Sequence, residues 1–191
     1  MIYTSSKLSS VLVAALLSAF ALRAADDGAE WSVKGGLVNP QGDLRTLTKN
    51  AVGFGGELGF DILPTKDAGV GFGFHAGFLS AKGKRQDFET HTAKATHGGV
   101  DLIYALGQSP LTIRTGLELV SWDVTSLKPK VGTGAQGETT WKFGFRAGGE
   151  FRFNKQWSLT AMYSFSQWKS DADANIAVNP SFVSLMAGYK F

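Results

Sequence analysis

The sequence contains no cysteine, so neither a disulfide nor a thiolate metal site can stabilise its fold. Charged residues make up only 18% of the chain, whereas an average soluble domain has roughly 25%. No apolar stretch approaches the roughly 18 residues of a membrane-spanning helix. The net charge is only +3 and the basic residues are scattered, which argues against a nucleic-acid partner. These absences leave membrane insertion through strands as an alternative source of stability.

Glycine and aromatic residues, by contrast, are abundant. The 191 residues include 24 glycines, and aromatic side chains reach 12%. The mean hydropathy is -0.02, which by itself would suit an ordinary soluble protein. Glycine and rings together favour many strands with small residues on one face and aromatic residues on the other.

The amino terminus has the features of an export signal. Lys7 precedes a short apolar run over residues 8–20, and Ala19-Phe20-Ala21 forms a small-x-small cleavage motif. The run is too short to span a membrane as a helix. We therefore predict a signal peptide over residues 1–25, cleaved between 21 and 25, and one mature domain over residues 26–191.

From Trp31 to Phe191 the sequence alternates with a period of two residues, as β-strands do. In the clearest segment, Thr139–Phe153, mostly aromatic residues occupy one face, and Lys, Arg, Glu and Gly occupy the other. A helical period would spread rings and charges over every face. The alternation predicts strands at Trp31–Val38, Val52–Ile62, Val70–Ser80, Thr92–Leu106, Leu111–Trp122, Thr139–Phe153, Trp157–Trp168 and Ser181–Phe191.

Short and long connections alternate between these strands. The short ones are Pro64-Thr65-Lys66-Asp67, Gly107-Gln108-Ser109-Pro110 and Asn154-Lys155-Gln156. The long polar ones are Asn39–Ala51, Ala81–His91, Asp123–Glu138 and Lys169–Pro180. This order is typical of a barrel with short periplasmic turns and longer outside loops. We predict an all-β fold, an eight-stranded antiparallel up-and-down transmembrane β-barrel, with both termini on the short-turn side.

The volume of the barrel decides which face points inward. An eight-stranded barrel has an interior that side chains just fill, and rows such as Trp141-Phe143-Phe145 would overfill it. Rings therefore point outward, although a soluble or lipid-carrying barrel remains the alternative. Aromatic residues also gather near both strand ends, as membrane interfaces favour, with Phe78, Trp122, Trp141 and Trp168 at the long-loop end.

The last strand ends on an alternating apolar face that includes Leu185, Tyr189 and a terminal Phe191. This pattern resembles the assembly signal of bacterial outer-membrane proteins. The mature chain resembles the small eight-stranded barrels typified by the OmpA transmembrane domain, OmpX and the opacity proteins. The resemblance implies a monomer in the outer membrane of a Gram-negative-type cell, inserted by the barrel-assembly machinery and in contact with outer-membrane lipid and lipopolysaccharide.

Charged residues on the inward face are expected to pair, because an unpaired buried charge costs several kcal/mol. Arg114, Glu118, Arg146 and Glu150 are predicted to form part of one closed network that plugs the lumen. A polar solute path gated by the same ion pairs is the alternative. The full predicted set is Lys34, Glu57, Asp61, Asp101, Arg114, Glu118, Lys142, Arg146, Glu150 and Arg152.

Three histidines are candidate metal-binding or catalytic groups. His75, His91 and His97 lack the close spacing of a zinc site, so no metal and no cofactor is predicted. The resembled family includes lipid A-modifying enzymes. Its deacylase type needs a serine two residues after a histidine, and none of the three has one. We therefore predict no enzymatic activity.

The outer loops are the remaining places for function. The basic run Lys82, Lys84 and Arg85 is a candidate contact for lipopolysaccharide phosphates, with an ordinary solvated loop as the alternative. We predict a structural role, or a surface-interaction role in adhesion or recognition in which the extracellular loops bind an extracellular ligand. A narrow channel is the second reading, because residues 34–40 faintly resemble the start of OmpW-type barrels, which are proposed paths for small hydrophobic molecules.

Overall fold

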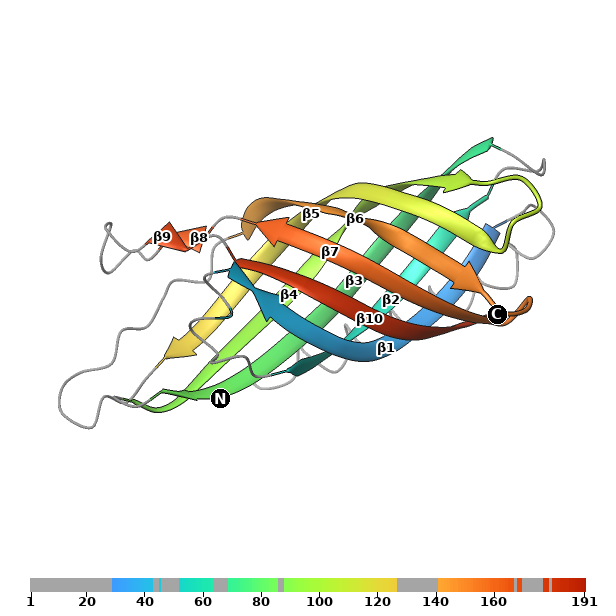
Figure 1. The fold of residues 1–191 in the computed structure, drawn as a ribbon. Helices are drawn as coiled ribbons and strands as arrows, with labels where there is room; N and C mark the ends of the chain where they lie inside the picture. Colours follow the sequence, from blue (N-terminus) through green and yellow to red (C-terminus); the bar gives the residue numbers. More distant parts are fainter. Residues whose placement is uncertain are drawn as a thin grey trace, which may run out of the picture.

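The computed structural model describes residues 29–42, 45, 52–63, 69–85, 88–126, 141–166, 168–169, 177–178 and 180–191. Eight antiparallel strands close into a barrel in the order β1-β10-β7-β6-β5-β4-β3-β2 (Figure 1). They are β1 (Ala29–Gln41), β2 (Gly53–Ile62), β3 (Gly69–Arg85), β4 (Phe88–Ala105), β5 (Leu111–Ser126), β6 (Trp141–Arg152), β7 (Trp157–Ser166) and β10 (Pro180–Lys190). The eight predicted strands and the fold class are confirmed. Among the described residues, no helix is long and apolar enough to cross a membrane.

Two of the predicted short turns lie within the described residues, and both are confirmed. Between β4 and β5, Gly107 adopts a φ of 62°, and the Ser109 amide donates to the Leu106 carbonyl at 3.1 Å. Between β6 and β7, the Asn154 side chain accepts hydrogen bonds from the amides of Gln156 and Trp157, both at 2.8 Å. The predicted turn at Pro64-Thr65-Lys66-Asp67 lies outside the described residues, as do residues 1–28 with the predicted signal peptide.

The predicted loop Ala81–His91 is wrong. β3 continues to Arg85 and β4 begins at Phe88, with Lys82 opposite Thr92 and Gly83 opposite His91. Where a strand extends beyond the membrane, its outward face no longer needs apolar residues. The polar sequence of this segment therefore resembles that of a loop. Likewise, β5 runs to Ser126 into the predicted loop Asp123–Glu138. Within the predicted loop Lys169–Pro180, β9 (Ala177–Val178) pairs with β8 (Trp168–Lys169) in a separate two-stranded sheet.

The aromatic face points outward, as predicted. Phe143 is 78% exposed and Phe54 59%, whereas inward residues such as Arg114 and Glu150 are buried. Rings gather at the short-turn end, where the Trp31 and Phe60 centroids lie 4.7 Å apart and those of Trp157 and Tyr189 lie 5.1 Å apart. The apolar outer surface therefore suits the hydrocarbon layer of a membrane.

Trp122 is a correction to the predicted aromatic belt. Its side chain is fully buried in the lumen, and its indole N–H donates to Ser166 Oγ at 2.8 Å. Because Trp122 lies at an even number of residues from Arg114 and Glu118, strand alternation places all three on the inward face. The alternation could have found this, but the prediction followed the position of Trp122 near the strand end.

Inward glycines leave the space that long polar side chains occupy. Gly73 lies opposite both Asp61 and Asp101 on the neighbouring strands. A Cβ atom at Gly73 would lie 2.7 Å from Asp61 Oδ1. Gly99 similarly lies between His75 and Glu118. The lumen is therefore built from rows in which a long polar residue on one strand faces a glycine on the next.

Candidate functional site in the barrel lumen

One half of the lumen holds a network of buried ion pairs centred on Arg146. Its guanidinium donates to Glu57 Oε2 at 2.6 Å and to Asp101 Oδ2 at 2.6 Å, and its Nε donates to Asp101 Oδ1 at 2.8 Å. Arg146 belongs to β6 and Glu57 to β2, which lie four positions apart in the eight-stranded ring. This contact therefore bridges opposite walls of the barrel.

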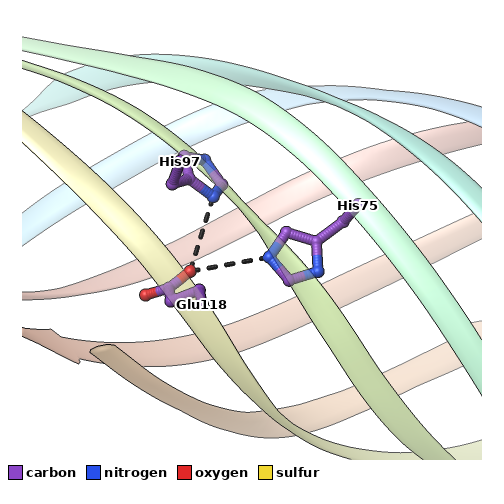
Figure 2. A group of neighbouring side chains, drawn as sticks. All are labelled: His75, His97 and Glu118. Carbon is purple, nitrogen blue, oxygen red and sulfur yellow. Dashed lines mark ion pairs between the residues drawn. The ribbon is translucent and has the colours of Figure 1, made fainter. Parts of the chain in front are cut away.

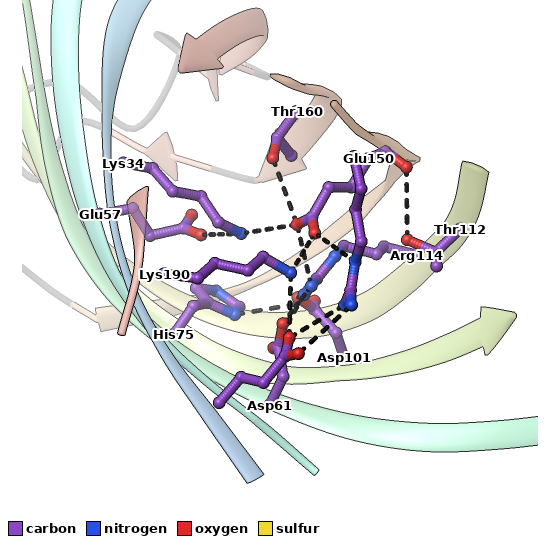
Figure 3. A network of polar contacts seen from close by, with 12 residues as sticks. Lys34, Glu57, Asp61, His75, Asp101, Thr112, Arg114, Glu150, Thr160 and Lys190 are labelled. Carbon is purple, nitrogen blue, oxygen red and sulfur yellow. Dashed lines mark hydrogen bonds and ion pairs between the residues drawn. The ribbon is translucent and has the colours of Figure 1, made fainter. Parts of the chain in front are cut away.

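A second centre is Glu150, whose carboxylate lies within 4 Å of four cations, three of them fully buried (Figure 3). Lys190 Nζ lies 2.6 Å from Glu150 Oε1, while Arg114 Nη2 and Lys34 Nζ lie 3.0 and 3.4 Å from Glu150 Oε2. Arg114 also forms a two-pronged pair with Asp61. Lys34 joins the two centres, because its Nζ also lies 3.5 Å from Glu57 Oε1.

The structure brings together most of the predicted lumen charges, with four differences. Lys142 is only half-buried and forms no ion pair within the described part of the chain. Arg152 lies at the short-turn end, 3.1 Å from Glu30 and 3.4 Å from Glu150. The prediction missed Lys190, although its alternation with Tyr189 and Phe191 in β10 was a usable signal.

Glu118 is the fourth difference, and it corrects the predicted grouping. It forms no ion pair with Arg114, Arg146 or any other Lys or Arg of the described residues. Instead its Oε2 lies 3.7 Å from His75 Nε2 and 3.5 Å from His97 Nδ1 (Figure 2). Histidines 22 positions apart in the sequence meet because β3 and β4 pair with His75 opposite Gly99 and Gly77 opposite His97. Sequence spacing alone could not reveal this group, since it depends on the pairing register.

An apolar layer lies beside the two histidines. The His97 ring contacts Phe182 edge-on at 6.4 Å between centroids, and Phe182 contacts Trp122 at 6.2 Å. The full buried cluster is Val38, Leu79, Ala93, Ala95, Val120, Trp122, Phe182 and Met186. The predicted lumen was entirely polar, so this layer is new. The layer is formed in part by inward Val, Leu and Trp residues near the long-loop ends of β1, β3 and β5.

Of the other predicted site residues, Leu185, Tyr189, Phe191 and Lys82 lie on the outside of the barrel. Leu185, Tyr189 and Phe191 are exposed on one face of the last strand and its end, by 46%, 36% and 68%. Their role as an assembly signal stays a prediction. Lys82 is exposed on β3, and Lys84 and Arg85 continue the same strand, with side chains outside the described set.

A closed antiparallel barrel with an apolar outer face and a charged lumen defines an outer-membrane β-barrel protein. The chain belongs to the outer membrane protein beta-barrel domain family, whose model matches residues 12–191. It is a protein of the bacterial outer membrane. No curated protein sequence matches it significantly.

Solved structures similar to the chain share its fold at low sequence identity. Ail of Yersinia pestis, in complex with the heparin analogue sucrose octasulfate, is 18% identical, with a TM-score of 0.54 over 85% of this chain and 99% of that one. Neisserial surface protein A is 16% identical, with a TM-score of 0.52 over 85% and 96%. The N-terminal barrel domain of Pseudomonas aeruginosa OprF is 12% identical, with a TM-score of 0.52 over 86% and 98%.

Proposed function

We propose that this protein is a non-conducting surface-interaction barrel whose extracellular end binds anionic groups on lipid or saccharide. The observation that carries the proposal is the projection of β3 and β4 beyond the membrane, with exposed lysines on it. The filled lumen supports the same conclusion, because it leaves the outer end as the place for binding.

Charged side chains reach across the lumen, which supports a plug. Arg146 bridges β6 to β2, and Lys34 on β1 lies within 3.4 Å of Glu150 on β6. The apolar layer around Trp122 and Phe182 fills the next level toward the loops. A solute would have to break desolvated ion pairs and part packed rings, so the structure favours a plug over a path.

The strands differ enough in length to leave part of the barrel outside the membrane. β7 has 10 residues, whereas β3 has 17 and β4 has 18. At about 3.3 Å per residue and a tilt of about 40°, 10 residues rise about 25 Å, the height of the apolar band. By the same arithmetic, 17 residues rise about 43 Å, so the β3–β4 hairpin projects about 15 Å or more above that band.

Basic residues lie on this projection. Lys82 and Lys94 are both exposed, on neighbouring strands and with a register offset of two residues. Lys84 and Arg85 follow Lys82 along β3. Ammonium and guanidinium groups bind sulfate and phosphate through charge-assisted hydrogen bonds. The complex of the structurally similar Ail with a heparin analogue supports this chemistry for a barrel of the same fold.

Catalysis is not part of the proposal. Neither His75 nor His97 has a hydrogen-bond partner among the described residues, so neither activates a serine there. A lipid A mass profile that changes when the protein is expressed would contradict this part of the proposal.

Binding of the outer end is tested with refolded protein in detergent micelles and two pairs of probes. Heparin is compared with desulfated heparin, and lipid A with dephosphorylated lipid A. The variant Lys82→Ala/Lys84→Ala/Arg85→Ala should bind the charged member of the recognised pair about tenfold more weakly, and added salt should weaken wild-type binding. Lys155→Ala, at the short-turn end, is the control and should bind as wild type. Equal affinity of the triple variant and wild type for both charged probes would refute the proposal.

A further inference from the structure

We infer that His75, His97 and Glu118 form a binding site for a divalent transition-metal ion of the Zn²⁺ type, enclosed in the barrel lumen. The site is independent of the outer end and of the proposed surface interaction. One ligand atom from each of the three side chains lies within 4.8 Å of the other two (Figure 2). Two imidazoles and one carboxylate form a donor set that Zn²⁺ and related ions prefer.

The distances are close to those of a loaded site. In a tetrahedral site with ligands about 2.1 Å from zinc, neighbouring ligand atoms lie about 3.4 Å apart. Glu118 Oε2 already lies 3.7 Å from His75 Nε2 and 3.5 Å from His97 Nδ1. A small closing movement of the two imidazoles toward each other completes the triangle. Three protein ligands leave a fourth position for water.

The polar atoms of the cluster need a partner that the described protein does not supply. His75, His97 and Glu118 are 6%, 4% and 1% exposed. Both nitrogens of each imidazole and both oxygens of Glu118 are buried without a hydrogen bond. Buried polar groups without partners are costly, and a bound ion satisfies one atom on each residue at once.

Charge balance points to a cation at this position. Among the described residues, the buried set has five carboxylates, at Glu57, Asp61, Asp101, Glu118 and Glu150, but only four Lys or Arg side chains, at Lys34, Arg114, Arg146 and Lys190. Each of the other four carboxylates lies within 4 Å of a Lys or Arg. Among the described residues, Glu118 faces imidazoles instead.

The surroundings are those of an oriented metal ligand. His75 Nδ1 lies 3.6 Å from Asp101 Oδ1, so that carboxylate faces the ring nitrogen opposite to the ligand atom. A carboxylate in this position fixes the tautomer and the orientation of a metal-bound histidine. Gly99, between His75 and Glu118, leaves room for the imidazole, because a Cβ there would lie 3.0 Å from His75 Cε1.

The same packing predicts how the ion enters. Among the described residues, the apolar layer lies on the loop side of the cluster and the ion-pair network on the other, so a hydrated ion would have to pass one of them to reach the site in a folded barrel. The metal is expected to be captured during folding and then released slowly. It ties β3, β4 and β5 together inside the lumen.

The test uses the mature, untagged chain, refolded from urea into detergent with ZnCl₂, desalted against a chelator and measured for zinc by atomic absorption. The mobility difference between boiled and unboiled samples on a denaturing gel verifies folding. Wild type should retain about one zinc per barrel, and His97→Ala and Glu118→Gln at least tenfold less. His91→Ala, which removes the remaining histidine of the chain, is the matched control and should retain zinc as wild type does.

Two outcomes overturn the inference. One is folded wild type that retains no zinc after refolding in its presence. The other is folded His97→Ala that retains as much zinc as wild type. If His97→Ala does not fold, His97→Gln takes its place. Wild type refolded with Co²⁺ then provides an independent readout: visible absorption bands of tetrahedral cobalt are expected, and their absence contradicts the site.

Discussion

Replacing Arg146 by Met should destabilise the barrel strongly, because it removes the cation that joins two buried carboxylates across the lumen. Arg146 is 1% exposed and donates four hydrogen bonds to Glu57 and Asp101, at 2.6 to 3.4 Å. Met fills a similar volume without charge, so the change tests the ion pairs rather than a cavity.

The expected loss is about 4 kcal/mol, because breaking a buried ion pair by removing one partner typically costs about 3–5 kcal/mol. The loss is not larger because each carboxylate keeps a second partner, Lys34 at 3.5 Å for Glu57 and Arg114 at 3.7 Å for Asp101. At an m-value of about 2 kcal/mol/M, the urea midpoint should fall by about 2 M.

Arg152→Met is the matched control. Arg152 lies on the same face of β6, but its side chain is 24% exposed and its partner Glu30 is 30% exposed. Its loss should cost at most about 1 kcal/mol. Urea unfolding in lipid vesicles, followed by gel mobility, measures both variants. Adding Glu57→Gln and Asp101→Asn to Arg146→Met should recover more than half of the loss. Equal destabilisation by Arg146→Met and Arg152→Met would refute the assignment of the network as the buried centre of stability.

Three further outcomes are expected. The folded barrel should be heat-modifiable, with unboiled and boiled samples migrating differently; folded monomer recovered from an aqueous fraction without detergent would contradict its outward apolar face. Deletion of Phe191, 68% exposed at the end of the last strand, should reduce assembly in the outer membrane more than export, and wild-type outer-membrane levels of the truncated protein would reject the assembly signal. Wild-type protein in a planar bilayer should show little or no steady conductance, because Arg146 and Lys34 reach carboxylates across the lumen; a large and stable conductance would favour the channel.

The strand count and the direction of each face could be predicted because both depend on local alternation. Phe143 and Arg146 are an odd number of residues apart along one strand, so their side chains lie on opposite faces. The limited volume of the barrel interior then places the ring outside. The ends of β3 and β4 could not be predicted in this way, since their outer halves lie beyond the membrane and lose the apolar signal. The same alternation could have placed Lys190 and Trp122 inward, but the predicted set omitted Lys190 and assigned Trp122 to the aromatic belt.

The local sequence pattern could not predict the histidine cluster, for a different reason. Alternation places His75 and Glu118 inward, but it says nothing about which row of the barrel each occupies. Their meeting depends on the register of two hairpins, which sets Gly99 opposite both of them. An error of one register step would send either side chain to the lipid face.

The rows of glycine opposite long polar residues also constrain how such a barrel changes over time. A side chain added at Gly73 would place its Cβ 2.7 Å from Asp61 Oδ1, the end of the long side chain opposite it, so growth at one position must be matched by shrinkage on the adjoining strand. Interior positions are thus expected to diverge in correlated pairs, one strand losing a long residue as its neighbour gains one. Loop positions are not subject to this pairwise constraint and can change one residue at a time. Among related barrels, interior residues are then expected to change slowly and loop residues to change faster.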